Sequence, residues 1–332
     1  MKKTTNLLLI IAAGIFAAAA WLALYAYTEF RPAQLPLQFD LKTGSSLKSA
    51  AQQMADAGVL GNAAQFVILA RLLGAAGKIK AGNYEVNRPI SPLALLRKIT
   101  EGDYTQSTMT FVEGWTFRQI RKLLDEHPAI KHDTRGLSDG EIQQRLGLDQ
   151  PSLEGWFFPD TYHFSSGASD LAILHRALQL MQSHLTAQWE KRAADLPLKS
   201  PYEALILASI IEKETGKAAE RPLVAAVFVN RLRIGMRLQT DPAVIYGLGE
   251  NFDGDLRKRD LLADTPYNTY TRAGLPPTPI AMPGLDSLNA TLNPPKNNFL
   301  YFVSRGDGTS YFSRTLEEHD RAVTKYQKSG RR

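Results

Sequence analysis

One uninterrupted apolar segment close to the N-terminus constrains this chain more than any other feature. No charged residue stands between Lys3 and Glu29, and the 21 residues from Leu7 to Tyr27 are apolar apart from the single Gly14. A helix of that length would be about 31 Å long, which matches the roughly 30 Å of a bilayer's hydrocarbon core. The segment therefore predicts a membrane-spanning helix.

The residues at the two ends of this segment predict its orientation. Lys2 and Lys3 precede it, and aromatic residues gather at the other end, over 21–27. Positive charge marks the cytoplasmic side, and aromatic residues favour the membrane–water interface. We expect a single-pass anchor in the inner membrane, with the N-terminus in the cytoplasm and the rest of the chain in the periplasm. A cleaved signal peptide is the alternative, because Ala18–Ala20 could form a cleavage site, but the apolar run continues past these alanines.

Composition excludes several classes of chemistry. The 332 residues contain no cysteine, so disulfides, thiolate metal sites, Fe–S clusters and a cysteine nucleophile are ruled out. The net charge of +6 is too small to indicate a nucleic-acid partner. The six histidines have no metal-ligand spacing, and phosphate-loop, dinucleotide and G-x-S-x-G motifs are absent. We therefore expect no metal and no cofactor, and chemistry that depends on carboxylates, amides and hydroxyls.

Beyond the anchor (1–28) and a proline-containing tether (29–36), the sequence predicts a small α/β module over 37–105. Alternating apolar residues predict a strand at Leu37–Leu41, and Gly44-Ser45-Ser46 gives the turn before a first helix that begins at Leu47. A second helix over about 63–73, a strand that ends near Val86, and a third helix opened by Ser91-Pro92 complete it.

The order of turn, Gly-Ser-Ser-Leu, two helices and Ala81-Gly82-Asn83-Tyr84 resembles a LysM-type glycan-binding module. The helices are longer than is usual for such modules, and the proline that normally closes the motif is missing. A small α/β spacer without a ligand is the alternative reading of the same pattern.

Residues 106–332 predict a larger mixed α+β domain, so the fold class is α+β. Helical periodicity is expected over 117–126, 170–194, 202–215 and 221–233, and the charged stretch 131–149 reads as a surface excursion. A loop-rich segment follows, and aromatic strands on either side of Gly306-Asp307-Gly308 predict a hairpin near the end of the chain.

Two glutamates at the end of the buried 202–215 helix are the best candidates for catalysis. Glu212 and Glu214 are two residues apart, about 200° around a helix, so they cannot share a face. Glu214 follows the most apolar stripe of the helix, which includes Leu207 and Ile210. Burial there would favour the neutral carboxyl and raise its pKa toward that of a general acid. Alternatively, both glutamates are solvated residues at a helix end.

The loops that follow this helix are rich in amides, hydroxyls and tyrosines. Gln239, Asn268 and Tyr270 belong to them, among several glycines and prolines. Such groups suit a ligand with many hydroxyl and amide groups, as in a sugar polymer. The same loops could instead be structural turns.

Taken together, six strings in order resemble the endolytic murein transglycosylase family, the YceG-like proteins. They are the N-terminal anchor, Lys80-Ala81-Gly82-Asn83-Tyr84 with its module, Val112-Glu113-Gly114, Glu154 to Thr161, Glu212-Lys213-Glu214-Thr215, and Leu238 to Pro242. The resemblance implies cleavage within nascent peptidoglycan strands beside the inner membrane, by one catalytic glutamate that falls on Glu214. It also implies that the cut ends glycan elongation, with peptidoglycan synthases as partners.

A single catalytic carboxyl has a mechanistic consequence. Hydrolases use two carboxyl groups, whereas one alone can protonate the glycosidic oxygen and then deprotonate the muramic acid's own 6-hydroxyl, which closes a 1,6-anhydro ring. Glu113, Glu154 and Asp160 are candidates for a second carboxylate, although they read as turn and cap residues. A muramidase-type hydrolase and a non-catalytic wall-binding scaffold are the alternatives. We expect the MurNAc–GlcNAc strand to be bound by Gln239, Thr240, Asn268, Tyr270 and Glu212.

Overall fold

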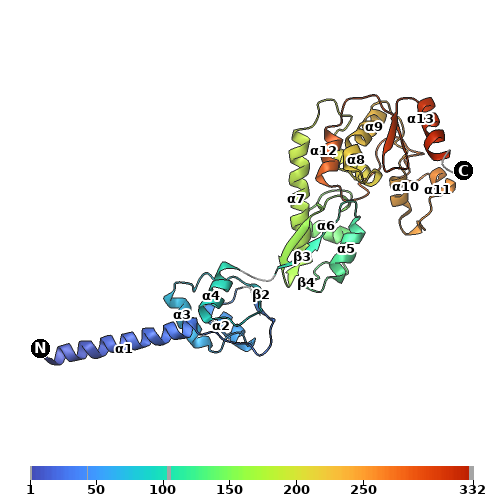
Figure 1. Ribbon diagram of the computed structural model, residues 1–332. Helices are drawn as coiled ribbons and strands as arrows, with labels where there is room; N and C mark the ends of the chain where they lie inside the picture. Colours follow the sequence, from blue (N-terminus) through green and yellow to red (C-terminus); the bar gives the residue numbers. More distant parts are fainter. Residues whose placement is uncertain (1, 43, 103–105, 329–332) are drawn as a thin grey trace. The chain divides into compact units, whose positions relative to one another are not determined.

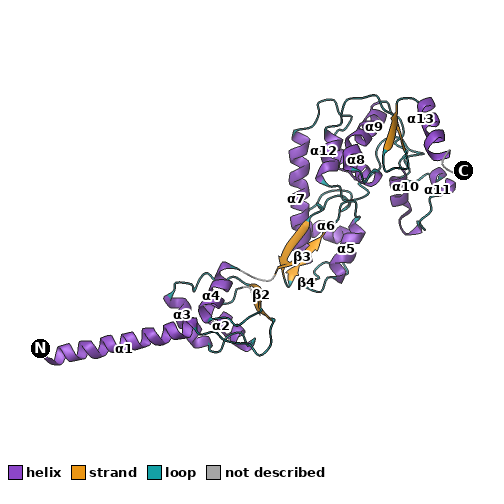
Figure 2. Cartoon of the chain, in the orientation of Figure 1, coloured by secondary structure: helices purple, strands orange, loops and turns teal. Residues whose placement is uncertain are grey.

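The protein, seen here as a computed structural model, is described over residues 2–42, 44–102 and 106–328 (Figures 1 and 2). The chain divides into two compact units. Unit 1 comprises Met1–Thr108 with His163–Ala168, and unit 2 comprises Met109–Tyr162 with Ser169–Arg332. Helices dominate both units, and the described strands form two-stranded sheets only. The class is therefore α+β, as the sequence predicts.

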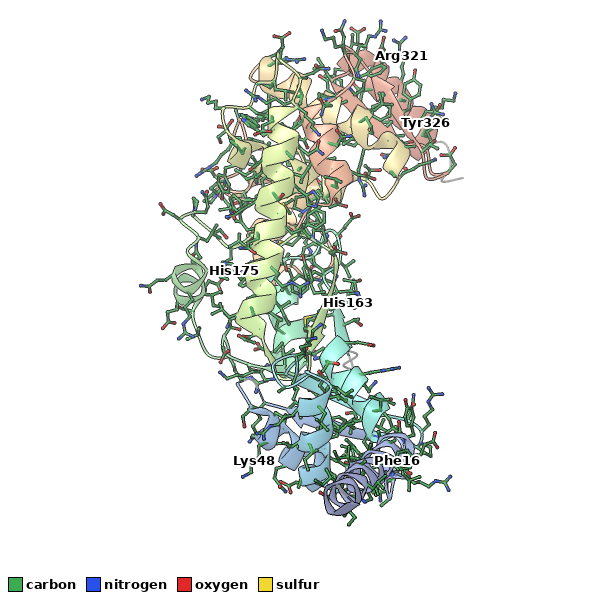
Figure 3. All side chains as sticks on the ribbon, turned by 90° about the vertical axis from the view of Figure 1, so that its left-hand side faces the viewer. Phe16, Lys48, His163, His175, Arg321 and Tyr326 are labelled. Carbon is green, nitrogen blue, oxygen red and sulfur yellow. The ribbon has the colours of Figure 1, made fainter. Side chains whose placement is uncertain are left out.

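Unit 1 begins with the long apolar helix. Helix α1 spans Lys2–Tyr27, and its part from Leu9 to Tyr27 has a mean hydropathy of 2.2. Most side chains on this part are exposed, among them Phe16, which Figure 3 labels, whereas Ala26 near its end is buried. By length and composition α1 can cross a membrane, which is consistent with the predicted span.

The rest of unit 1 is a small α/β fold. Strand β1 (Leu37–Leu41) pairs antiparallel with β2 (Gly82–Val86), with Leu37 opposite Val86 and Leu41 opposite Gly82. Helices α2 (Leu47–Asp56), α3 (Ala63–Leu72) and α4 (Pro92–Glu101) begin at the side-chain caps Ser46, Asn62 and Ser91. The core between them contains Phe39, Met54, Phe66, Tyr84 and Ile99.

The predicted order of strand, two helices, strand and helix is found in this fold. Glycan binding by it stays a prediction, as does its relation to LysM modules. The predicted end of the module at residues 103–105 lies outside the described residues, as do residues 329–332 at the end of the second predicted domain.

Two short strand pairs involve the segments at either end of 163–168. Strand β3 (Gln106–Thr110) pairs with β5 (Thr161–Ser165), and β4 (Ile130–Lys131) pairs with β6 (Ala168–Ser169). Helix α5 (Phe117–Glu126) lies where the sequence predicts it.

The prediction of a surface excursion over 131–149 is wrong in part, because helix α6 (Asp139–Leu146) occupies its second half. Ser138 and Glu141 form a reciprocal capping box, and Ile142 and Leu146 are buried. Two apolar residues among many charged ones give a weak periodic signal, whereas the Ser-x-x-Glu cap would have located this helix.

The core of unit 2 is built around α8 (Pro201–Glu214). This helix packs against α7 (Asp170–Glu190), α9 (Arg221–Arg233), α10 (Asp241–Leu248) and α12 (Leu285–Leu292), and Figure 1 shows it enclosed by the first two and α12. Every residue from Ala204 to Ile211 is buried. A helix apolar all round needs partners on all sides, and these four supply them.

The segment predicted to be loop-rich contains short helices as well. Besides α10 and α12 it includes α11 (Lys258–Leu262) and the 3₁₀ turn Gly249–Asn251; another 3₁₀ turn, Ala218–Glu220, precedes α9. Helices of five to eight residues are too short to show a clear period.

The predicted hairpin is confirmed, because β7 (Tyr301–Ser304) pairs antiparallel with β8 (Ser310–Ser313). Helix α13 (Leu316–Val323) and a short π-helix (Thr324–Lys328) follow it.

Candidate active site

The last turn of α8 carries the candidate catalytic residue. Ser200 caps the helix by accepting the N–H of Glu203, and Pro201 occupies its first turn. The helix ends at Glu214, since Thr215 has an extended backbone. A buried helix therefore delivers a carboxyl group at its C-terminal end, where the helix dipole does not favour negative charge.

Glu214 is partly buried and is held in place by a hydroxyl group. The Oγ1 of Thr240, the residue before α10, donates a hydrogen bond to Oε1 of Glu214. Burial raises the pKa of Glu214 to about 7; the Thr240 hydrogen bond opposes that rise, and the nearby negative charge of Asp241 adds to it. The carboxyl can thus carry a proton near neutral pH, as predicted for a general acid, and its catalytic role stays a prediction.

Glu214 opens into a cleft of about 500 Å³. One side of the cleft comes from α8, α9 and the loop before α10, and the other from β7 and α13. Aromatic and polar groups share its lining, which is typical of a sugar-binding site. The lining residues on which the argument depends are Glu214, Arg231, Gln239, Asp241, Tyr270, Tyr301 and His319.

Arg231 is a cleft residue that sequence reasoning missed. Its Nε donates to the carbonyl of Leu300 at 2.7 Å and its Nη1 to the carbonyl of Leu238 at 2.6 Å, and the guanidinium lies 5.3 Å from the ring centre of Tyr301. Burial lowers its pKa, while the charge of Glu214 raises it. The available signal was its spacing, since Arg231 follows the buried Phe228 by three residues on α9. An arginine in that apolar stripe needs buried partners.

Gln239 lines the cleft with an unusual backbone. Its φ is 51°, the one positive value among described non-glycine residues, and its N–H donates to the carbonyl of Thr269 at 3.1 Å. The next residue, Thr240, donates its N–H to Oγ1 of Thr269 at 3.0 Å. Left-handed backbone at a non-glycine residue is strained and is often found at functional sites. The paired loops 238–240 and 268–270 hold it in place.

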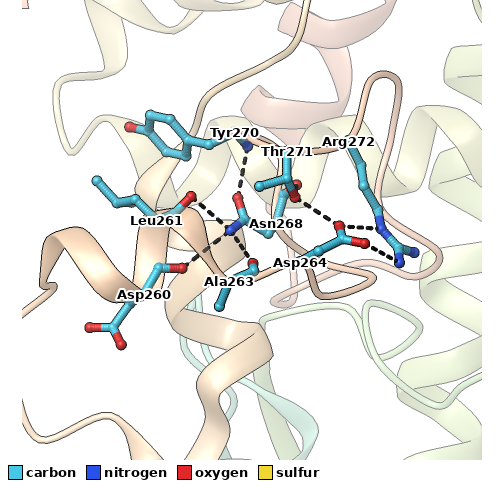
Figure 4. Close-up of polar contacts among 8 residues, drawn as sticks. All are labelled: Asp260, Leu261, Ala263, Asp264, Asn268, Tyr270, Thr271 and Arg272. Carbon is cyan, nitrogen blue, oxygen red and sulfur yellow. Dashed lines mark hydrogen bonds and ion pairs between the residues drawn. The ribbon is translucent and has the colours of Figure 1, made fainter.

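Asn268 organises the second of these loops and does not face the cleft. It is fully buried, and its Nδ2 donates to the backbone carbonyls of Asp260, Leu261 and Ala263 at 3.2, 3.1 and 2.6 Å (Figure 4). Its Oδ1 accepts the N–H of Tyr270 at 2.9 Å. The amide is occupied on both sides. Asn268 does not line the Glu214 cleft in this structure, and its expected contact with the sugar stays a prediction.

Tyr270 reaches the cleft and contacts a carboxylate there. Its hydroxyl donates to Oδ1 of Asp241 at 2.6 Å, and burial raises its pKa above the ordinary value. Asp241 is exposed and lines the same cleft as Glu214. Asp241 stands within the Leu238 to Pro242 string, and no local feature of the sequence marks it as a second carboxylate.

Glu212 lies on a different side of α8 and does not line the cleft. Its side chain is 5% exposed, its Oε1 is 3.1 Å from Nη2 of Arg221, and its Oε2 accepts the N–H of Gly284 at 2.9 Å. The predicted separation of the two glutamates is found, but an enclosed ion pair leaves Glu212 unavailable to a substrate. Its expected role in substrate binding stays a prediction.

The other candidate carboxylates also lie outside the Glu214 cleft. Glu154 accepts the N–H of Phe117, at the start of α5, on both oxygens at 3.0 and 3.2 Å, and the hydroxyl of Tyr246 at 3.1 Å. Burial raises its pKa to about 7, and it lines a separate cleft of about 1140 Å³. Asp160 accepts the N–H of Thr161, and Glu113 lies near Arg221. These are the cap, turn and ion-pair roles typical of structural carboxylates.

Across the described residues, no group of three His, Cys, Asp or Glu side chains is placed to hold a metal ion.

Comparison with known proteins agrees with the sequence-based resemblance. The model of the YceG-like family matches residues 39–325. The endolytic murein transglycosylase of Bacillus subtilis (strain 168) is 32% identical over 307 residues, which cover 87% of this chain and 84% of that protein. That of Streptococcus pneumoniae serotype 2 is 28% identical over 288 residues, 76% of this chain. The match covers 51% of the streptococcal protein, so the chain spans about half its length.

A solved structure is similar over most of its length. The crystal structure of a yceG-like protein from Listeria monocytogenes is 30% identical, with a TM-score of 0.53, and the match covers 86% of this chain and 98% of that one.

Proposed function

The chain belongs to the YceG-like family, and from this premise we propose that it is a peptidoglycan lytic transglycosylase with Glu214 as its catalytic acid and base. One observation carries the proposal: a partly buried carboxyl, whose pKa desolvation raises to about 7, opens into a cleft lined by aromatic and polar groups. The relatives named endolytic murein transglycosylases support the reaction class.

The proposed reaction needs one proton carrier. The neutral carboxyl of Glu214 protonates the glycosidic oxygen between MurNAc and GlcNAc as the C1–oxygen bond breaks. The resulting carboxylate takes the proton of the muramic acid 6-hydroxyl, and that oxygen bonds to C1. One proton moves from the 6-hydroxyl to the leaving oxygen, water is not consumed, and the product carries a 1,6-anhydro end. The neighbouring Thr240 orients the carboxyl through its hydrogen bond, and both this bond and the positive charge of Arg231 stabilise the charged form.

Gln239, Tyr270 and Tyr301 are the proposed contacts for the sugar rings. They line the cleft on either side of Glu214 and combine an amide with two aromatic faces. Aromatic faces stack on sugar rings, and the amide can hydrogen-bond to an N-acetyl or hydroxyl group.

We further propose that α1 anchors the enzyme in the inner membrane, N-terminus inside, and that cleavage occurs within nascent strands as they leave the peptidoglycan synthases. The apolar length of α1 supports the anchor. Cutting within a strand would end its elongation. The module over 37–105 would retain long strands, so its deletion should leave the chemical product unchanged and weaken retention on glycan.

A muramidase-type hydrolase is the second candidate, because Asp241 shares the cleft with Glu214. A hydrolase pairs an acid with a second carboxylate that activates water or attacks C1. Mass spectrometry of the muropeptides released in heavy-oxygen water separates the two reactions. Anhydro ends without heavy oxygen are expected, whereas heavy oxygen at the new reducing end would make the enzyme a hydrolase.

A further inference from the structure

Helix α3 and its C-cap residue Leu73 expose large apolar side chains. Ile68, Leu72 and Leu73 are 47, 68 and 53% exposed, and outside α1 they are the large hydrophobic side chains exposed among the described residues of unit 1. Ile68 and Leu72 are four residues apart, so they are neighbours on one side of the helix. Phe66 and Ala70 point into the core instead. The helix is therefore apolar on two faces, of which one is unpartnered.

This helix packs against the end of α1. The hydroxyl of Tyr25, near the last turn of α1, donates to the carbonyl of Asn62, the N-cap of α3, at 3.1 Å. Phe30 and Ile90 exchange backbone hydrogen bonds at 2.9 and 3.1 Å, which ties the chain after α1 to the start of α4. If α1 spans a bilayer, α3 lies where the chain leaves it.

The charged residues on α3 and in the segment that follows it have one sign. Between Asp56 and Glu85 the charged residues are Arg71, Lys78 and Lys80. Over 29–102 nine lysine and arginine residues face five aspartate and glutamate residues, a net charge of +4. A cationic surface around exposed apolar side chains is typical of segments that lie on anionic lipid.

We propose that this patch, defined as Ile68, Leu72 and Leu73 with Arg71 and Lys78, docks on the anionic lipid surface from which α1 emerges. The apolar side chains enter the boundary between headgroups and acyl chains, and the cations pair with lipid phosphates. The inference rests on the proposed membrane span of α1 and is independent of the reaction catalysed.

Lipid quenching of a fluorescent label tests the proposal on the full chain. Because the chain contains no cysteine, Leu72→Cys, Lys48→Cys and Phe16→Cys each give one labelling site for a bimane probe. Lys48 is exposed on α2 and, like Phe16, is labelled in Figure 3. Each variant is placed in nanodiscs of phosphatidylcholine and phosphatidylglycerol that contain a shallow or a deep doxyl lipid.

The shallow doxyl lipid should quench the Leu72 label at least about twofold more strongly than the Lys48 label. The deep doxyl lipid should quench the Phe16 label. Adding Arg71→Gln and Lys78→Gln, or omitting phosphatidylglycerol, should weaken the Leu72 signal. Equal quenching at Leu72 and Lys48 would overturn the proposal. A blue-shifted Leu72 label insensitive to lipid would assign the patch to a protein partner instead, and an unquenched Phe16 label would remove the membrane span and the docking together.

Discussion

Thr240 donates its hydroxyl hydrogen bond to Oε1 of Glu214 across 26 residues of sequence. The contact joins the last residue of α8 to the residue before α10, so the position of the carboxyl depends on two helix ends at once. Thr240 is itself buried and fixed by Thr269 through its backbone N–H. The site therefore has a rigid acid, oriented by loops that also line the cleft.

Glu214→Gln should abolish strand cleavage and leave the fold intact. Glutamine keeps the shape and can accept the Thr240 hydrogen bond, but it cannot transfer a proton. Loss of a general acid–base group costs about 10²–10⁴-fold in rate, and more is expected where one group serves both half-reactions. Muropeptide release measures the rate, and circular dichroism checks the fold. Full activity in this variant would move the catalytic role elsewhere.

The pH dependence of cleavage should follow the titration of Glu214. The reaction starts from the neutral carboxyl, whose pKa burial raises to about 7. The value of kcat/KM should therefore fall as the pH rises through about 7. A profile that instead rises across this range would contradict the assignment of Glu214 as the acid.

Stability should also decrease as the pH rises over this range. The pKa values of Glu214 and Glu154 are raised from 4.5 to about 7, so the folded protein keeps two protons that the unfolded chain releases. The free energy of unfolding should thus be largest below about pH 4.5 for these two groups and should fall until about pH 7. Glu154→Gln should flatten the decline, as urea unfolding at several pH values would measure. An unchanged slope would mean that Glu154 is not protonated in the folded state.

Glu212→Gln should affect stability more than chemistry. The side chain is enclosed beside Arg221, and removing its charge leaves that cation less well compensated. We expect a loss of about 1–3 kcal/mol in unfolding free energy, with cleavage reduced far less than by Glu214→Gln. Glu203→Gln, on the first turn of the same helix, is a control for general effects on α8. Loss of cleavage with unchanged stability would instead give Glu212 a direct role.

Asn268→Ala should destabilise unit 2 and weaken substrate binding together. The variant leaves three backbone carbonyls without their donor, which costs about 2 kcal/mol or more. The loop that carries Tyr270 should then loosen, so KM should rise more than kcat falls. The exposed Asn251→Ala serves as a control. A variant as stable as the wild type but impaired only in binding would restore the direct sugar contact first expected of Asn268.

Asp241→Asn separates the two proposed reactions. Asparagine still accepts the Tyr270 hydrogen bond but cannot act as a nucleophile or base. A lytic transglycosylase should keep its activity to within about tenfold, whereas a hydrolase that uses Asp241 should lose about 10²–10⁴-fold. The product analysis in heavy-oxygen water is repeated on this variant.

The elements of the fold were predictable where sequence periods are long. The apolar faces of α5 and α9 and the alternation of β1 give their bounds closely, and the separation of Glu212 from Glu214 follows from helix geometry alone. The desolvation that raises the pKa of Glu214 was predictable from the apolar stripe before it on this helix, which includes Leu207 and Ile210.

The environment of the site was not predictable, because it is assembled from distant segments. Arg231 of α9 lies beside the ring of Tyr301, the first residue of β7, although 70 residues of sequence separate them. Nothing in the local sequence relates Asn268 to the carbonyls to which its amide donates. The residues next to an asparagine in the sequence do not distinguish a buried asparagine from one that binds a substrate. Only the tertiary contacts distinguish them.

The backbone of Gln239 implies that thermal stability and activity make opposite demands on this position. Its φ of 51° is a conformation that glycine adopts without strain, whereas a residue with a Cβ is destabilised there by about 1–2 kcal/mol. The protein keeps a side chain at this position despite that penalty. Efforts to raise the melting temperature would select Gln239→Gly early, and the thermostable variant they obtained would lack the amide that lines the Glu214 cleft.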